Sequence, residues 1–329
     1  TALATTLTPS SATADGTFTL GAGSFAATDV GKRITGNSGE AIITSTAGAY
    51  SLVTAFTNTS AIASGSWQMY ALDFDATNGV TLSNGLVGWD VSGATLDSTY
   101  GTSASLFWFS DDGTKVVMSS IAGDWFATAA LSTAWDFSTA TGDLSFNYGS
   151  QETVGYALAM SSDGQYVYIG GDSGSNVFVY TLSTPFDSST ASYSSGMNFN
   201  YTSQTSNCTA LYFKPDGTKM YIGSYATNEV IEYNLSTAWN PSTATVVYQK
   251  NVNAEEPNPK GVSFNSDGTK MYIIGYLNDS IIEYTLSTAW SISTATSPTT
   301  LFSVAAQTTA PESLFIGSNG LYAYVGSSA

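Results

Sequence analysis

Carboxylates are the side chains of this chain best suited to chemistry, because histidine is absent and cysteine occurs once. Four glutamates depart from the pattern of the sequence around them: Glu152, Glu255, Glu256 and Glu312. Two carboxylates that face each other in a closed pocket can hydrolyse a glycosidic bond, one as acid and the other as nucleophile or base. We therefore take these glutamates as candidates for a ligand-binding rim and, as an alternative, for a glycosidase site. In the second case, replacing Glu256 and Glu312 abolishes glycan cleavage.

Composition excludes several other kinds of site. Without histidine the chain can form no Ser-His-Asp triad, no Cys-His pair and no histidine-containing zinc site. The formal net charge is -17 at pH 7, with Arg33 as the one arginine, so we expect binding to neither nucleic acid nor an anionic membrane. No segment approaches the ~20 apolar residues of a membrane-spanning helix. Cys208 cannot close an intrachain disulfide, so we expect it to be a small buried residue. We expect no cofactor and no metal.

Two sequence markers recur in one register over most of the chain. The first is an Asp-Gly pair that returns every 51 to 53 residues. Its copies are Asp112 and Gly113, Asp163 and Gly164, Asp216 and Gly217, Asp267 and Gly268, and a weaker Asn319 and Gly320. The second is Leu-Ser-Thr-Ala-Trp, which ends in Trp135, Trp239 and Trp290 and becomes Leu-Ser-Thr-Pro-Phe at Phe186. Two markers that keep the same step indicate a true structural repeat.

Each repeat predicts four short antiparallel strands. Apolar residues alternate before the Asp-Gly pair, as at Leu211 and Phe213, and an aromatic-rich strand follows it. The Asp-Gly pair is typical of a tight hairpin turn with positive φ values. A third strand, such as residues 230–233, and a less regular fourth, such as residues 246–249, complete the unit. Four strands in about 50 residues are typical of a propeller blade, so we predict an all-β fold with a β-propeller at residues 66–329.

The last repeat stops after two strands, so the predicted ring needs strands from elsewhere. Residues 67–72 match the third strand of the other repeats, and residues 79–82 can follow as the fourth. We therefore predict five blades, the last one closed by strands from the N-terminal side. Six blades, or closure by a partner chain, remain open because the interval from Leu72 to Leu131 exceeds the repeat. The residues six positions before the turn aspartates or the equivalent residue 319 are mostly small, such as Gly261, with Leu106 as the exception, and small residues suit strands that converge on a central axis.

The period is lost in the first 65 residues, which predict a small β-domain. Short alternating runs at residues 17–20, 41–44 and 50–53 are separated by Gly, Ser, Asn and Asp turns, as expected for about five or six strands. Compact modules fused before a ring usually serve in attachment or assembly, and by this analogy we assign that role to residues 1–65.

The repeated residues have both a structural and a functional interpretation. The aromatic residue of the second marker could stack on a sugar, but we prefer a structural role, closing the outer end of its blade or packing against the neighbouring blade. The turn aspartates could bind calcium, but one carboxylate per turn lacks the alternating acids of a calcium loop, so we prefer turn chemistry. The off-pattern glutamates precede innermost strands, so we expect them to border one mouth of the channel.

The repeat unit, read for example over residues 216–245, resembles a propeller repeat of structural proteins of tailed bacteriophages. The resemblance covers roughly residues 103–329, and its Asp-Gly half is also similar to the repeats of TolB-like and YncE-like bacterial propellers. Residues 29–34, 39–44 and 60–67 together are similar to a small module of phage tail, fibre and neck proteins. What the resemblance implies is a virion component, without any catalytic residue.

We therefore predict a non-enzymatic structural component of a phage virion, located at the tail, fibre, neck or capsid surface. Its propeller would contact other virion proteins or a host-surface glycan or protein, and we expect a homo-oligomer in the assembled particle. The alternative is a secreted, extracellular bacterial adhesin or lectin-like propeller, which an export signal in the gene would distinguish. The glycosidase is the third hypothesis.

Overall fold

The computed structural model describes residues 104–328 apart from 143, 144, 297, 319 and 321, and before residue 104 it describes eight strands. The chain divides into two compact units, Thr1–Asp75 with Ser83–Asp97 and Ala76–Leu82 with Ser98–Ala329. No helix in the described part of the chain is long and apolar enough to cross a membrane. Asn319 of the weakened Asp-Gly turn, and residues 29–32 and 60–66 of the attachment module, lie outside the described residues.

The first unit contains a six-stranded antiparallel sheet in the order β1-β2-β5-β4-β3-β6. Its strands are β1 (Leu7–Pro9), β2 (Gly16–Leu20), β3 (Arg33–Gly36), β4 (Gly39–Ala47), β5 (Tyr50–Thr54) and β6 (Trp67–Tyr70). Strand β6 corrects one prediction. Sequence matching placed residues 67–72 in the last blade, but β6 pairs with β3, with Arg33 opposite Tyr70. The Tyr-x-Leu match was too short to specify a sheet, because alternating strands fit any sheet with one covered face.

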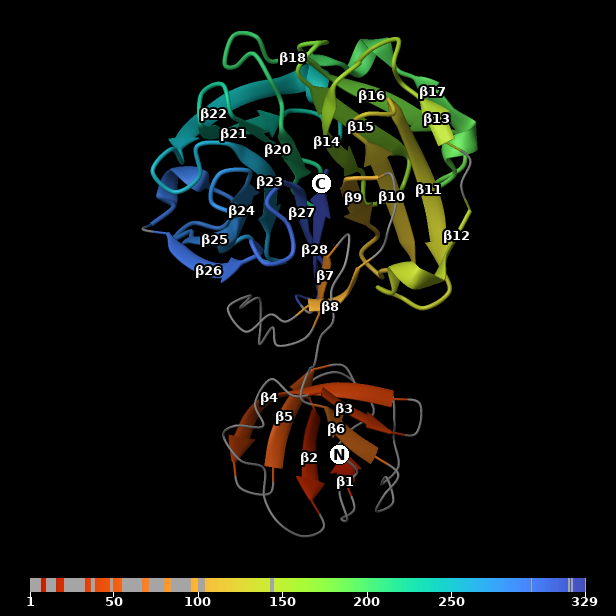
Figure 1. Cartoon of the computed structure of the whole chain (residues 1–329), viewed down its shortest axis with the longest axis vertical. Helices are drawn as coiled ribbons and strands as arrows, with labels where there is room; N and C mark the ends of the chain where they lie inside the picture. The colour runs from red at the N-terminus through yellow and green to blue at the C-terminus, as the bar shows by residue number, and fades with distance from the viewer. Residues whose placement is uncertain are drawn as a thin grey trace. The chain divides into compact units, whose positions relative to one another are not determined.

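The second unit contains four antiparallel blades, each formed by contiguous chain (Figure 1). Blade 1 comprises β9 (Leu106–Phe109), β10 (Lys115–Ser120), β11 (Trp125–Leu131), β12 (Ala140–Thr141) and β13 (Ser145–Asn147). Blade 2 comprises β14 (Gly155–Met160), β15 (Tyr166–Gly171), β16 (Asn176–Leu182), β17 (Ala191–Tyr193) and β18 (Phe199–Asn200). Blade 3 comprises β19 (Ala210–Phe213), β20 (Lys219–Ser224), β21 (Glu229–Leu235) and β22 (Ala244–Asn251). Blade 4 comprises β23 (Pro259–Phe264), β24 (Lys270–Gly275), β25 (Ser280–Thr285) and β26 (Thr299–Ser303).

Outer strands differ among these blades. In blades 1 and 2 the outer position is shared by two short strands, so that β12 and β13 both pair with β11, and β17 and β18 both pair with β16. Short 3-10 helices precede or interrupt the outer strands: η3 (Phe137–Thr139), η4 (Ser188–Thr190), η5 (Ser195–Met197), η6 (Pro241–Thr243) and η7 (Ile292–Thr294). The predicted all-β propeller is confirmed at the level of these four blades.

A further sheet joins segments from distant parts of the sequence. Its order is β27-β28-β7-β8, with β27 (Pro311–Ile316), β28 (Tyr322–Ser327), β7 (Val80–Ser83) and β8 (Leu96–Thr99). We call it the composite sheet. Residues 79–82, predicted as a fourth strand, overlap β7, which instead stands third, and β8 takes the fourth place.

The Asp-Gly turns differ in one respect from the sequence prediction, since only the glycine has positive φ. In blade 3, Gly217 has φ 71° and its N–H donates to the carbonyl of Lys214 over 2.7 Å. Asp216 is not among the positive-φ residues, and its Oδ1 accepts the N–H of Thr218 at 3.0 Å. The turn therefore needs a left-handed backbone only at its glycine. The aspartate side chain accepts the N–H of the residue that follows the glycine.

The two sequence markers form one packed unit in each blade. Trp239 has φ 63°, and its N–H donates to the carbonyl of Gly217 at 2.9 Å. Its ring lies so close over the glycine that a Cβ there would be 2.5 Å from ring carbons. The same arrangement pairs Trp135 with Gly113, Phe186 with Gly164, and Trp290 with Gly268. Packing and turn geometry therefore account for the repetition of both markers.

Tyrosine hydroxyls join neighbouring sheets at three interfaces of the second unit. The hydroxyl of Tyr168 in blade 2 donates to the carbonyl of Trp239 in blade 3 at 2.8 Å. Tyr221 in blade 3 donates to the carbonyl of Trp290 in blade 4 at 2.7 Å. Tyr324 of the composite sheet donates to the carbonyl of Trp135 in blade 1 at 2.5 Å. The same tyrosine-to-carbonyl hydrogen bond therefore repeats across three interfaces, including the one between the last described strand and the first blade.

Candidate functional site

Three innermost strands begin with a β-bulge at the same position of the repeat. The pairing register shifts at Tyr156 in blade 2, at Lys260 in blade 4 and at Glu312 in the composite sheet. Each of these residues stands seven positions before its Asp-Gly turn or the equivalent residue 319. A bulge leaves one residue unpaired and redirects its side chain. The repeat therefore brings three different side chains to one end of the central channel.

Lys260 contacts both of the other side chains, and we call the three the Lys260 cluster. Lys260 Nζ lies 3.0 Å from Glu312 Oε2 and 4.0 Å from the centre of the Tyr156 ring. Lys260 is 6% exposed and Glu312 is 5% exposed. The hydroxyl of Ser328 donates to Glu312 Oε1 at 2.9 Å. The buried ammonium is thus neutralised by a carboxylate on one side and covered by an aromatic face on the other.

Tyr225 and Asp172 extend the cluster outward. Both belong to the loops that connect the second and third strands of their blades. The Tyr225 hydroxyl donates to Asp172 Oδ2 at 2.9 Å, and its ring centre lies 5.9 Å from Lys260 Nζ. Burial raises the pKa of Tyr225, and the hydrogen bond to Asp172 raises it further. Burial also raises the pKa of Tyr156, with added repulsion from Glu312 and then from other carboxylates. Both phenols therefore stay protonated and can act as hydrogen-bond donors at neutral pH.

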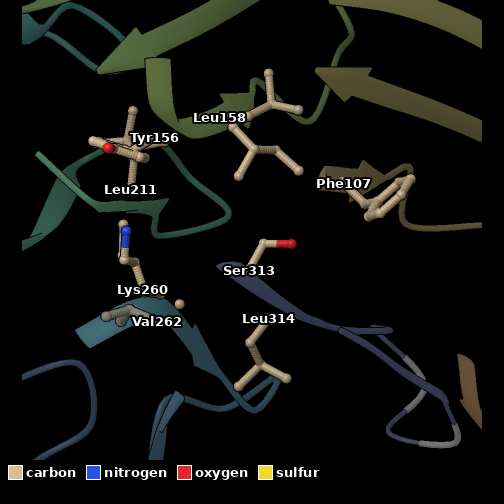
Figure 2. Close-up of a pocket in the computed structure, with 12 residues that line it drawn as sticks. Phe107, Tyr156, Leu158, Leu211, Lys260, Val262, Ser313 and Leu314 are labelled. Atoms are coloured by element: carbon tan, nitrogen blue, oxygen red, sulfur yellow. The ribbon is translucent and has the colours of Figure 1, made fainter. Parts of the chain in front are cut away.

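A small cavity of about 20 Å³, room for about one water molecule, lies among the innermost strands beside the cluster. Figure 2 shows a largely apolar wall, with Lys260, Tyr156 and Ser313 as its labelled polar side chains. The apolar wall includes Phe107, Leu158, Leu211, Val262 and Leu314, one from each innermost strand. Close approach of these strands requires small residues, since a Cβ on Gly261 would lie 2.5 Å from the backbone nitrogen of Leu314. The site thus combines a narrow apolar channel with a charged, aromatic end.

Of the four glutamates singled out from the sequence, Glu312 belongs to the Lys260 cluster, and Glu152 and Glu256 hold loops together. Glu152 is fully buried and accepts the N–H groups of Val154 and Gly174, both at 2.9 Å. Glu256 is fully buried and accepts N–H groups from residue 258 at 2.9 Å and residue 278 at 3.0 Å. Each carboxylate thereby ties the loop entering its blade to the hairpin between the second and third strands.

The repeat supports a structural role for these two glutamates. The equivalent residues of blade 3 and the composite sheet are Thr205 and Thr308, whose hydroxyls bond to the serine hydroxyl at the end of the second strand of the sheet, Ser224 and Ser327. Burial raises the pKa of Glu256, an effect that the backbone N–H groups oppose. Glu255 is half-buried, and one of its carboxylate oxygens accepts the hydroxyl of Tyr284 at 3.1 Å. Each of these three carboxylates is therefore engaged by groups of its own blade.

The turn aspartates are engaged by their own turns. The hydroxyl of Ser110 donates to Asp112 Oδ1 at 2.7 Å, and the N–H of Thr114 donates to the same oxygen at 2.9 Å. These hydrogen bonds, that of Ser110 first, lower the pKa of Asp112. Within the described residues, no three His, Cys, Asp or Glu side chains lie together as a metal-binding group.

Sequence reasoning missed Lys260, Tyr156, Tyr225 and Asp172. The sequence prediction rested on four off-pattern glutamates, so it included neither a lysine, nor the two tyrosines, nor a loop aspartate. A usable signal was present, because the position seven before the Asp-Gly turn holds Tyr156, Lys260 and Glu312 in three different repeats. A position that varies in chemistry within an otherwise regular repeat marks a place where packing does not dictate the residue.

No protein-family model and no curated protein matches this chain. Among solved structures, it is similar to a periplasmic gluconolactonase of Pseudomonas aeruginosa, with 12% identity, TM-score 0.45 and coverage of 75% of each chain. A putative 6-phosphogluconolactonase of Bacteroides uniformis has 12% identity and TM-score 0.44, covering 97% of this chain and 76% of its own. A functionally unknown protein of Desulfotomaculum acetoxidans has 10% identity and TM-score 0.39, covering 64% and 76% respectively. At these values the likenesses carry no argument about activity.

Proposed function

We propose that this protein is a non-enzymatic structural component of a phage virion, whose propeller binds a partner at the mouth of its channel. The binding role rests on the Lys260 cluster, a buried ion pair covered by an aromatic ring beside a cavity. The absence of catalysis is supported by Glu152 and Glu256, whose carboxylates are occupied by backbone N–H groups of their own loops. The virion setting rests on the resemblance of the repeat to phage structural proteins.

We further propose that the ring has five blades, with the composite sheet as the fifth. Tyr324 supports this proposal, because its bond to the Trp135 carbonyl repeats the bonds by which Tyr168 and Tyr221 join neighbouring blades. The hydroxyl of Ser313 also donates to the carbonyl of Ser105 at 2.8 Å, which links the innermost strands of the composite sheet and blade 1. Rigid closure of this kind suits an appendage exposed outside a cell.

Immunogold electron microscopy, with antibody against the propeller, tests the virion role. The expected result is gold at one defined place on phage particles, whether tail, fibre, neck or capsid. Gold on cell surfaces, with none on particles, would overturn the proposal in favour of a secreted adhesin.

A hydrolysis assay tests the non-enzymatic part separately. We expect no release of reducing ends from host-surface glycans by the wild-type protein. Cleavage that is lost in Glu256→Gln and Glu312→Gln would restore the glycosidase hypothesis.

A further inference from the structure

The outer strand of blade 3 differs from those of the other blades. Strand β22 is continuous over eight residues, whereas blades 1 and 2 divide the outer position between strands of two or three residues. In the described part of the chain β22 pairs with β21 alone, and its other edge lies at the rim of the propeller (Figure 1). Sheets usually avoid long open edges, because such edges pair readily with a further chain. Blade 3 therefore presents the longest open outer edge of the four blades.

Three consecutive apolar side chains are exposed on this strand. Val246 is 48% exposed, Val247 is 45% exposed and Tyr248 is 41% exposed. They are three of the six large apolar side chains that are exposed in the described part of the chain, so exposed apolar surface is concentrated here. We call these three residues the rim patch.

The repeat does not account for the rim patch. At the corresponding positions, the three residues after the Ala-Thr or Ala-Ser pair, the other blades have Gly-Asp-Leu from Gly142, Tyr-Ser-Ser from Tyr193 and Ser-Pro-Thr from Ser297. Glycine, aspartate, serine and proline weaken or end an outer strand. Blade 3 therefore carries apolar strand-forming residues where packing within the other blades requires none.

A β-bulge displays the patch. Two neighbouring residues of β21 lie opposite Val246 and Tyr248, so Val247 is the extra residue of the outer strand. A bulge interrupts the ladder and redirects the side chain of the extra residue. It also hinders the addition of strand after strand at an open edge. A partner at this rim therefore contacts the patch mainly through side chains, which favours a limited contact over a continuous sheet.

The order of side chains suits a second copy of this chain. Residues 245–249, Thr-Val-Val-Tyr-Gln, keep their order of polar and apolar side chains when read in the opposite direction. If two copies meet about a two-fold axis at Val247, their outer strands run antiparallel. Val247 then faces Val247, and each Val246 faces Tyr248 of the other copy. Aromatic and β-branched side chains are favourable partners in such pairs, and a two-fold contact requires this self-complementarity.

The charges along β22 are compatible with this contact. The chain carries a formal charge of -17, so two copies repel each other in most orientations. Strand β22 contains Lys250 and no carboxylate. About the two-fold axis at Val247, Lys250 lies opposite Ala244 of the other copy rather than opposite a second lysine. The rim patch therefore lets two acidic copies approach without opposing like charges along the strand.

We propose that the rim patch is a contact between two copies of this chain, related by a two-fold axis at Val247. The inference goes beyond the proposed function, because it concerns the outer rim of the propeller and not the channel mouth. Three side chains from each copy form a small interface, so we expect a weak dimer with a dissociation constant of about 10 to 500 µM. Such a contact becomes effective where many copies are held together.

Sedimentation equilibrium of the full chain tests the inference. We expect the average mass to rise from that of the 34.3 kDa monomer toward twice this value as the concentration increases. The rise should be steeper at high salt, because salt screens the repulsion between the acidic copies.

Charged variants at the axis locate the contact. Val247→Lys and Val247→Glu should each remain monomeric, because like charges then face each other across the axis. An equimolar mixture of the two variants should associate again, because opposite charges then meet. Leu277→Lys is the matched control, since it makes the same charge change at a 60% exposed apolar residue of the hairpin between β24 and β25. It should associate as the wild type does.

Oxidative crosslinking gives a second readout. Val247→Cys brings two thiols together at the axis, and the native Cys208 is fully buried and does not compete. We expect a disulfide-linked dimer of Val247→Cys and at least about 10-fold less crosslinking of Leu277→Cys under the same conditions. Thermal unfolding verifies that each variant is folded.

Three outcomes would overturn the inference: the wild type stays monomeric up to ~1 mM, the folded Val247→Lys variant associates as the wild type does, or the mixture of Lys and Glu variants stays monomeric. Association through any other surface persists in Val247→Lys and therefore counts against the rim patch. These outcomes are independent of where immunogold locates the protein, so failure of the dimer leaves the virion role standing.

Discussion

Replacing Tyr221 by phenylalanine tests whether the tyrosine-to-carbonyl hydrogen bonds between blades stabilise the propeller. The hydroxyl of Tyr221 is fully buried and donates to the Trp290 carbonyl at 2.7 Å across the interface of blades 3 and 4. Phenylalanine keeps the ring, whose centre is 4.4 Å from that of Phe264, so the change isolates the hydrogen bond. Removing one partner of a buried hydrogen bond costs about 1 to 3 kcal/mol.

The size of the effect is measurable by calorimetry. A loss of about 2 kcal/mol lowers the melting temperature of a domain of this size by roughly 4 to 8 °C. Tyr248→Phe provides the control, because this tyrosine is 41% exposed and should leave the melting temperature unchanged. Because Tyr168 makes the same bond at a separate interface, Tyr168→Phe should add its own loss to that of Tyr221→Phe. A melting temperature within about 1 °C of wild type for Tyr221→Phe would show that this hydrogen bond does not stabilise the blade interface.

Three further changes probe the turn, the carboxylates and the ion pair. Gly217→Ala should lower the free energy of unfolding in urea by about 2 kcal/mol or more, because φ is 71° and the new Cβ would meet the tryptophan ring at 2.5 Å. Gly196→Ala, with no atom within 4 Å, should change it by less than about 0.5 kcal/mol, and equal effects would contradict the packing argument. Hydrogen bonds from Thr269 hold the pKa of Asp267 below its ordinary 3.8, so its contribution to stability is present above that pH and is lost as pH falls through the lowered pKa. The stability difference between wild type and Asp267→Asn should therefore shrink as melting is followed from pH ~5 to ~2, and a constant difference would count against this coupling. Lys260→Met alone should lower the free energy of unfolding by about 3 to 5 kcal/mol, because it leaves the Glu312 carboxylate buried without its partner. Adding Glu312→Gln should recover most of this loss. A Lys260→Met variant as stable as wild type would show that the ion pair is not buried.

The repeat was readable from the sequence because its two markers are one structural unit. The ring of each LSTAW aromatic covers the glycine of its own Asp-Gly turn, as Trp239 covers Gly217, so the two positions must keep a fixed spacing. Such local coupling leaves a strong periodic signal. The strands that precede the first repeat gave no comparable signal, because β6, β7 and β8 lack both markers and alternating residues do not specify a partner. For that reason Trp67–Tyr70 was placed in the wrong sheet.

The candidate site was only partly predictable for a different reason. The sequence located Glu152 and Glu256 in loops before innermost strands, but some of the N–H groups that bind them come from hairpins about 20 residues farther along. A carboxylate that is satisfied by backbone groups and one that faces a cavity look alike in sequence. Lys260 and Glu312 come from different innermost strands, and their pairing depends on ring geometry that local patterns do not encode.

The composite sheet has a consequence for how the protein is made. Blades 1 to 4 can each form from strands that leave the ribosome in succession, whereas β7 and β8 must wait for β27 and β28. The bond between Ser313 and Ser105 spans 208 residues of chain, so forming this interface carries a large loop-closure entropy. During translation, β7 and β8 therefore remain exposed edges while the four blades fold. We expect closure of this seam to be the last and slowest folding step, and the stage at which the nascent chain is most prone to pair with another strand.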